Sequence, residues 1–225
     1  MRSTHSRRTL LISGALMPLS LAVRGFAADA PKPDKDGWLS LFDGETLGGW
    51  KKTEFAAGGE VKVEKDFRKG GPAIVLGAGE RLSGFNWTKE IPKTNYELSL
   101  EAMKTDGRDF FCGLTFPVGD SFATLIVGGW GGGVVGISNI DNSDASENAT
   151  TKYLTFDKDK WYKIRLKVTK ARIEAWIDDK PVVDADIIGK KISLRPGDIS
   201  QSVPLGIATY RTDAAYRAIK IRNLK

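Results

Sequence analysis

The feature that most constrains this chain is an alternation of apolar and polar residues, which runs through most of its C-terminal two thirds. Successive side chains of a β-strand point to opposite faces, so a period of two predicts strands that are buried on one face. Glycine, aspartate and asparagine interrupt the alternation and predict the turns. The strands predicted in this way cover residues 96–103, 109–116, 121–127, 134–140, 161–169, 172–177, 181–184, 204–210 and 216–224.

The number and spacing of these segments predict the fold class. Many short strands without an amphipathic helical period are typical of an all-β protein, and we expect a single-domain concanavalin A-like or jelly-roll β-sandwich. Trp176 falls on the outer face of its strand, where it is either a sugar-stacking platform or a residue covered by a loop. The alternation assigns to the core Tyr162, Ile164, Leu166, Val168, Ile173, Ala175 and Ile177.

The N-terminal segment has the composition of an export signal. Residues 1–27 combine basic residues with an apolar run that is too short to span a membrane, and small residues end the segment. The pair Arg7 and Arg8 indicates a twin-arginine signal, and an ordinary secretory signal is the alternative. We therefore expect cleavage near Ala27, a periplasmic or extracellular protein, a linker at residues 28–36 and a sandwich domain at residues 37–225, with no transmembrane segment in the mature chain.

Charge and composition exclude several functional classes. The whole chain has a net charge of +6, and removing the four arginines of the signal leaves about +2, which gives no support for nucleic-acid binding. Cys112 is the only cysteine and lies in an apolar strand, so we expect a buried filler rather than a reactive thiol. His5 is the only histidine and lies in the signal. The mature protein therefore has neither a Ser-His-Asp triad nor a histidine-ligated zinc site.

A glycine-rich loop around Trp130 has the most unusual local composition. Residues 128–133 read GGWGGG and contain a literal G-x-G-x-x-G match, but a strand rather than a helix is predicted after it, so this is not a dinucleotide site. We expect a hairpin loop with Trp130 at its tip. Trp130 is then either a platform for a sugar ring or a side chain folded back over the sandwich.

The next segment concentrates oxygen donors. Residues 139–148 read NIDNSDASEN, and Asp141, Asp144 and Glu147 could hold a calcium-like divalent cation, with Asn139 as a further polar or substrate-binding group. The spacing is not that of an EF-hand, and Asp, Asn and Ser also gather in loops because they favour turns. A cation site and an ordinary turn are therefore both possible.

Other polar residues lie at strand ends. Arg108 and Asp109 open one predicted strand, and Arg211 follows Tyr210 near the C-terminus. Such groups either bind sugar hydroxyls or form surface ion pairs and turn caps. Glu97 and Glu101 share a strand face but are about 13 Å apart along the strand, which is too far for a pair of glycosidase carboxylates.

Two motifs at opposite ends of the domain resemble the 3-keto-disaccharide hydrolase domain family. Leu41-Phe42-Asp43-Gly44 with Leu47 and Trp50 is similar to the opening L-F-D-G-x-x-L-x-x-W of the family, and residues 214–224 are similar to its closing strand. Trp161-Tyr162 with Ile173, Trp176 and Asp178 is similar to its W-x-x-Y/I…W-x-N-G hairpin. The distant, turn-punctuated ends also predict that the first and last strands lie together in one sheet. The resemblance implies a concanavalin-like sandwich that cleaves 3-keto-glycosides, by hydrolysis or by a lyase route.

The chain departs from the family pattern where chemistry is expected. The family segment G-L-Q-D-H-G falls on residues 206–211, where Ala208, Thr209 and Tyr210 replace glutamine, aspartate and histidine. Three functions therefore remain: an enzyme on oxidised sugars that uses Tyr210, Arg211, Asp109 and Arg108, a non-catalytic module that binds carbohydrate through Trp130, Trp176 and Asn139, and a structural envelope protein.

Overall fold

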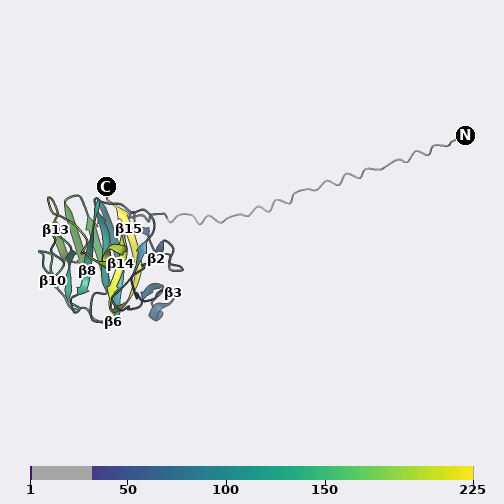
Figure 1. Ribbon diagram of the computed structural model, residues 1–225, viewed down its shortest axis with the longest axis horizontal. Helices are drawn as coiled ribbons and strands as arrows, with labels where there is room; N and C mark the ends of the chain where they lie inside the picture. The colour runs from purple at the N-terminus through teal and green to yellow at the C-terminus, as the bar shows by residue number, and fades with distance from the viewer. Residues whose placement is uncertain (2–31, 225) are drawn as a thin grey trace. The chain divides into compact units, whose positions relative to one another are not determined.

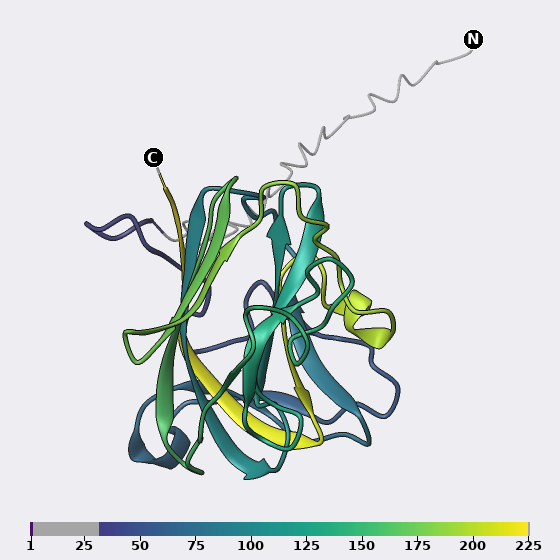
Figure 2. The ribbon, with the colours of Figure 1, turned by 90° about the vertical axis from the view of Figure 1, so that its left-hand side faces the viewer.

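The computed structural model describes Met1 and residues 32–224, which form fifteen strands in two antiparallel sheets (Figure 1). The predicted export signal and the first part of the predicted linker lie outside the described residues. Figure 2 shows the strands in two layers that face each other. The prediction of an all-β sandwich is confirmed.

One layer, called sheet A, has eight strands. Its order is β13 (Lys180–Asp186), β12 (Arg172–Ile177), β11 (Trp161–Val168), β6 (Tyr96–Gly107), β15 (Thr212–Asn223), β4 (Ala73–Leu76) and β3 (Val61–Glu64), and β1 (Leu39–Ser40) also pairs with β15. The pairing of β1 with β15 places Leu39 opposite Ile221, so the first and last strands do lie together.

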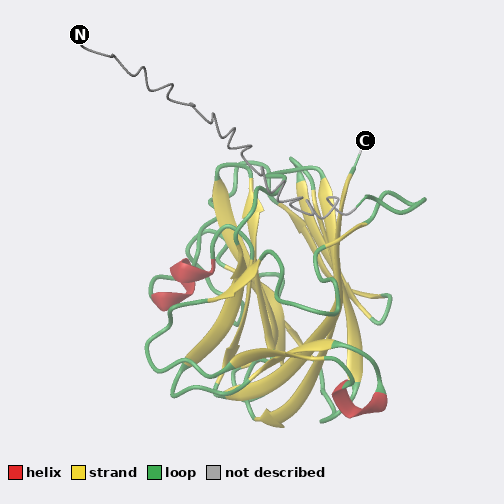
Figure 3. Cartoon of the chain, turned by 90° about the vertical axis from the view of Figure 1, so that its right-hand side faces the viewer, coloured by secondary structure: helices red, strands yellow, loops and turns green. Residues whose placement is uncertain are grey.

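The other layer, called sheet B, has seven strands. Its order is β10 (Lys152–Tyr153), β9 (Val134–Ser138), β8 (Ser121–Gly129), β7 (Cys112–Val118), β14 (Gly206–Tyr210), β5 (Leu82–Trp87) and β2 (Trp50–Lys52). Two short 3-10 turns, η1 (Phe67–Lys69) and η2 (Asp198–Ser202), lie on the outer sides of the layers (Figure 3).

The core lies between the inner faces of the two sheets and follows the predicted alternation. In β11 and β12 the residues predicted to be buried are all less than 9% exposed. The basic side chains of β11 point outward, where Lys163, Arg165 and Lys167 each face a carboxylate on the sheet surface. Cys112 is fully buried, and burial raises the pKa of its thiol to about 12, so this cysteine is a packing residue.

The sequence analysis did not predict the strands before residue 96 or the edge strand β10. These strands are two to six residues long. Most of them have at most four residues, too few for a period of two to stand out, and the apolar residues Leu82, Phe85 and Trp87 of β5 do not alternate regularly.

The opening motif is explained by a tight turn between the sheets. Both Asp43 carboxylate oxygens accept hydrogen bonds, from the Glu45 and Thr46 amides at 2.8 Å each and from the Thr46 hydroxyl at 2.8 Å, and these bonds lower the pKa of Asp43. Gly44 has φ +81, and a Cβ at this position would lie 2.9 Å from Pro72 Cγ. The Trp50 indole then donates to Leu41 O at 2.7 Å and closes the motif.

Trp176 lies on the outer face of sheet A, as predicted, and is partly exposed. The guanidinium of Arg165, on the neighbouring strand, lies 3.7 Å from the centre of its ring. A cation–π contact with an adjacent strand thus occupies one face of this tryptophan.

Candidate functional site

The candidate site lies on the outer face of sheet B. In this sheet, four of the five aligned positions across neighbouring strands are glycine or alanine, namely Gly84, Ala208, Gly113 and Gly136, and the fifth is Ile126. Residues directly opposite each other in neighbouring strands share a face, so this row is a low floor across the sheet. Segments outside the sheet approach it closely, because a Cβ on Gly113 would lie 2.9 Å from the Phe110 ring and one on Gly136 would lie 2.7 Å from Ala145 O.

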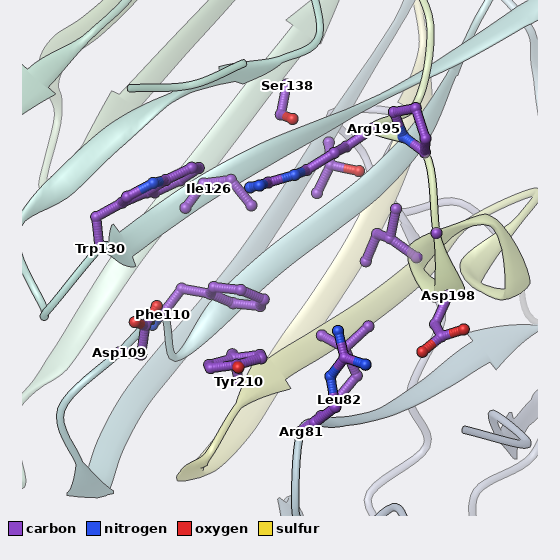
Figure 4. Close-up of a pocket in the computed structure, with 14 residues that line it drawn as sticks. Arg81, Leu82, Asp109, Phe110, Ile126, Trp130, Ser138, Arg195, Asp198 and Tyr210 are labelled. Atoms are coloured by element: carbon purple, nitrogen blue, oxygen red, sulfur yellow. Dashed lines mark hydrogen bonds between the residues drawn. The ribbon is translucent and has the colours of Figure 1, made fainter. Parts of the chain in front are cut away.

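A pocket of about 410 Å³ opens on this face of sheet B, and Ile126 is the residue of the row that lines it. Figure 4 shows its side chains converging from strands β5, β8 and β14 and from the loops around residues 109, 130 and 196. Aromatic and aliphatic side chains form part of the wall, and charged groups lie among them. The residues are Arg81, Leu82, Asp109, Phe110, Thr124, Ile126, Trp130, Ser138, Arg195, Pro196, Gly197, Asp198, Ile199 and Tyr210.

Asp109 is fixed at the point where the chain passes from β6 to β7. Its Oδ1 accepts the Phe110 amide at 2.7 Å, and its Oδ2 accepts the Gly131 amide at 3.3 Å. Its own amide donates to Thr212 Oγ1 at 3.2 Å. The carboxylate therefore joins the start of β7 to the Trp130 loop, and each oxygen keeps a lone pair for a ligand.

Trp130 forms the tip of the β8–β9 hairpin, as the sequence predicted. Its φ is +48, and its side chain is 43% exposed and lines the pocket. The Arg195 guanidinium lies 5.6 Å from the centre of its ring and forms an ion pair with Asp144 at 3.2 Å. The following segment is a strand, so the G-x-G-x-x-G match forms no dinucleotide-binding turn.

Tyr210 ends β14 and faces the pocket beside Phe110, with 6.2 Å between ring centres. Arg211 does not line the pocket. Its Nε donates to Glu80 O at 2.7 Å, its amide donates to Arg81 O at 2.9 Å, and its guanidinium lies 5.4 Å from the centre of the Tyr210 ring. Arg211 therefore positions Tyr210 and Arg81.

The other predicted residues lie elsewhere. Arg108 is exposed beside Asp109 and is not in the pocket lining. Asn139 is only 4% exposed and accepts the Ser138 hydroxyl at 2.8 Å, so Ser138 reaches the pocket and Asn139 does not. Trp176 is on sheet A, the opposite layer.

The three predicted metal-binding carboxylates do not converge. Asp141 accepts Lys190 Nζ at 2.9 Å, which lowers the pKa of its carboxyl, and it also accepts the Lys191 amide. Asp144 pairs with Arg195 and accepts the Ser146 amide at 2.9 Å. Within residues 32–224, no group of three or more His, Cys, Asp or Glu side chains is arranged to hold a metal ion. Asp141 and Asp144 are thus engaged in ion pairs and in hydrogen bonds to backbone amides.

Sequence reasoning missed Arg81, Phe110, Arg195 and Asp198 in the lining. Arg81 precedes β5, Arg195 lies in the loop between β13 and η2, and Asp198 begins η2. They come near Tyr210 through strand pairing and loop packing between distant segments, and no local pattern marks them.

The family described as the 3-keto-alpha-glucoside-1,2-lyase-like domain matches residues 37–222. This chain belongs to that family. The match covers most of the chain and confirms the family indicated by the two terminal motifs. The chain is therefore a β-sandwich domain of a carbohydrate-related family.

Solved structures share the fold of this family member at low sequence identity. The carbohydrate-binding module CBM66 from Bacillus subtilis is 15% identical with a TM-score of 0.51, over 78% of this chain and 96% of the module. Crh5 transglycosylase in complex with NAG is 11% identical with a TM-score of 0.55, over 86% of each chain. A carbohydrate esterase from the Shiga toxin-encoding bacteriophage phi24B is 11% identical with a TM-score of 0.51, over 80% of this chain and 92% of the esterase.

No curated protein matches the sequence. Among the residues that the structure describes, no helix is both long and apolar enough to cross a bilayer.

Proposed function

We propose that this protein cleaves 3-keto-glycosides in the pocket on the outer face of sheet B. The observation that carries the proposal is the convergence of Asp109, Tyr210 and Trp130, all singled out in the sequence, in one pocket that also contains two guanidinium groups. Membership in the 3-keto-glucoside lyase-like family supports the reaction class.

The chemistry uses the acidity that a ketone at C3 gives to the C2 proton. Asp109 takes the proton from C2, and the electron pair moves onto the C3 oxygen as an enediolate. Reformation of the C3 carbonyl then forms the C1–C2 double bond and breaks the bond from C1 to the leaving oxygen, which takes a proton from Tyr210. Water can later add across the double bond and complete a net hydrolysis.

The charged groups of the pocket suit these roles. Arg81 and Arg195 are cationic donors for the negative charge that develops on the C3 oxygen. Trp130 offers its face to the C–H side of the sugar ring. The proton transfers use side chains of the chain itself, and two of the predicted cation ligands, Asp141 and Asp144, pair with Lys190 and Arg195.

The test follows release of the leaving group from a chromogenic 3-keto-α-glucoside, with and without added calcium. We expect turnover by the wild type and a loss of at least about 100-fold in Asp109→Asn and Tyr210→Phe, because each removes a group that transfers a proton. Asp120→Asn is the matched control, since Asp120 is an exposed carboxylate that pairs with Lys93 at the surface. No turnover by folded wild-type protein, or full turnover by Asp109→Asn, would overturn the mechanism.

A non-catalytic carbohydrate-binding function is the second candidate. It is favoured by the backbone hydrogen bonds on both Asp109 oxygens and by the exposed Trp130 beside Arg195. In that case glycans bind without turnover, and Trp130→Ala abolishes the binding.

We propose that the protein acts in the cell envelope. The composition of residues 1–27 supports this place, and fractionation of cells that express the full chain or its Arg7→Lys/Arg8→Lys variant would test it.

A further inference from the structure

We propose that the protein has a second sugar-binding position on Tyr153, beyond the pocket, and that its ligands are oligosaccharides longer than a disaccharide. This inference rests on the proposed site in the pocket but depends on sugar binding rather than on cleavage. Tyr153 is 74% exposed, more than any other aromatic side chain that the structure describes.

Strand register places Tyr153 on the same face as the pocket. Tyr153 lies opposite Val134 in the pairing of β10 with β9. Val134 packs outside the main core in a small cluster with Ile126 and Phe110, and both of these residues line the pocket. Because directly opposite residues of antiparallel strands share a face, Tyr153 lies on the outer face of sheet B, with the pocket.

The geometry also fixes the separation between Tyr153 and Trp130. Val134 pairs with Gly129, the residue before Trp130, so the backbones of Tyr153 and Gly129 are two strand spacings apart, which is roughly 10 Å. This separation suits two neighbouring contacts along one glycan rather than two sites for unrelated ligands.

The turn that follows Trp130 carries no side chains, whereas Val134, which lies between Tyr153 and Gly129 in the sheet, is buried in a cluster with Ala145. The turn after Trp130 consists of Gly131, Gly132 and Gly133, and a Cβ on Gly131 would meet nothing within 4 Å. The Leu154 amide donates to Gly133 O at 2.9 Å, which fixes β10 against this turn. A sugar chain that leaves the pocket over Trp130 therefore meets no side-chain barrier in the turn before it reaches Tyr153.

The aromatic groups on this face form a row from the pocket to the edge of the sheet: Tyr210 on β14, Phe110 before β7, Trp130 after β8 and Tyr153 on β10. Figure 1 shows β10 at one side of the sandwich, and β9 lies between β10 and β8 in the sheet. Aromatic faces bind the C–H faces of sugars through apolar contact, and a row of them suits successive units of one chain. The neutral rings at the far end of the row fit an uncharged glycan.

The experiment measures the affinity ratio between a long and a short glucan by titration calorimetry. The probes are maltohexaose and maltose, each with and without a 3-ketone on the non-reducing unit, and cleavable probes are titrated against Asp109→Asn. We expect maltohexaose to bind the wild type more tightly, and Tyr153→Ala to reduce that ratio by about three- to tenfold while the affinity for maltose stays unchanged.

Two further variants separate stacking from general effects. Tyr153→Phe keeps the ring and should keep the ratio. Ile188→Ala removes an apolar side chain that is 71% exposed and far along the chain from β10, and it should also leave the ratio unchanged. A wild type that does not bind the longer glucan more tightly, or a ratio that survives in Tyr153→Ala, overturns the second position.

The outcome is distinguishable from failure of the proposed reaction. The unoxidised probes report the length dependence even when no 3-keto-glycoside is cleaved. Conversely, if a 3-keto-disaccharide is turned over but the longer glucan binds no more tightly than the shorter one, the second position at Tyr153 is excluded and the proposed reaction still holds.

Discussion

At the scale of single residues, the outer face of sheet A is organised around one buried carboxylate. Glu97 is 3% exposed and accepts Arg222 Nε at 2.8 Å, and its other oxygen faces Arg165 Nη1 at 3.5 Å. Each arginine also lies over a tryptophan, at 3.7 Å for Arg165 on Trp176 and 4.5 Å for Arg222 on Trp38. The negative charge of Glu97 therefore balances the positive charges of two guanidinium groups that are partly shielded from water.

Glu97→Gln should lower the free energy of unfolding by about 2–3 kcal/mol, because it leaves two arginines without their carboxylate. This figure is below that for a fully buried pair, since the two arginine side chains are 27% and 31% exposed. The measurement is urea unfolding at neutral pH.

Glu64→Gln is the control for this prediction, because Glu64 pairs with Lys62 on an exposed surface. It should change the free energy of unfolding by no more than about 0.5 kcal/mol. Equal effects of the two substitutions would contradict a special role for Glu97.

At the scale of elements, the pocket depends on how closely loops approach the floor of sheet B. The Phe110 ring lies over Gly113 of β7, where a Cβ would be 2.9 Å from Phe110 Cε2. Phe110 in turn lies beside Tyr210. The absence of a Cβ at Gly113 therefore allows the Phe110 ring, and with it the neighbouring Tyr210 ring, to take its position in the pocket.

Gly113→Ala should displace Phe110 into the pocket and lower kcat/KM for a 3-keto-glucoside by about tenfold or more, because small displacements of aligned groups are costly for catalysis. Overpacking should also cost about 1–3 kcal/mol of stability. Activity assays with thermal unfolding measure the two effects on the same sample.

Gly70→Ala serves as the comparison, because a Cβ there comes no closer than 3.4 Å to any atom outside its neighbours. It should leave kcat/KM unchanged. A Gly113→Ala protein that retains full activity would show that Phe110 is not part of the working pocket.

At the scale of the whole molecule, two buried tyrosines connect the sheets through the core. The Tyr96 hydroxyl, from β6, donates to Pro117 O at 2.6 Å, and the Tyr216 hydroxyl, from β15, donates to Phe111 O at 2.6 Å. Burial raises the pKa of both hydroxyls well above the usual value near 10, and the nearby Cys112 adds to the effect for Tyr216.

This shift makes the fold sensitive to alkali. Because the pKa is higher in the folded state, the unfolded chain loses these protons at a lower pH. The contribution of the two hydroxyls to the free energy of unfolding is therefore fully present below about pH 10 and falls as the pH rises above that value. The slope is about 1.4 kcal/mol per pH unit for each tyrosine. Urea unfolding between neutral pH and about pH 11 measures it.

Tyr216→Phe should lower the free energy of unfolding by about 1–2 kcal/mol at neutral pH, because Phe111 O loses its hydrogen-bond donor. It should also reduce the slope of the free energy of unfolding with pH, above about pH 10, by the contribution of one tyrosine. Tyr153→Phe, at an exposed position, should change neither quantity. An alkaline slope in Tyr216→Phe equal to that of the wild type would exclude the buried hydroxyl as its cause.

The fold class, the buried faces of β11 and β12 and the family were determined by the sequence alone. The alternation in β11 and β12 identified every core residue assigned there, and the turn around Asp43 and the strand β15 marked the family. These features are local: a strand's faces depend on neighbours two residues away, and a tight turn depends on three or four residues. Asp109, Trp130 and Tyr210 were found for the same reason, because each lies at a strand end or a turn.

Only the tertiary structure decided which of these residues meet. Arg81, Arg195 and Tyr210 lie in the same pocket although more than a hundred residues separate the first two along the chain. The register of β5, β14, β7, β8 and β9 aligns four glycine or alanine residues with Ile126, and this register arises from pairing between distant segments. The same pairing directs Arg165 over Trp176 and Arg195 toward Asp144, so a predicted sugar platform and a predicted cation ligand have other partners. Contacts between distant strands leave no periodic signal along the chain, because they depend on how the two sheets and their loops pack.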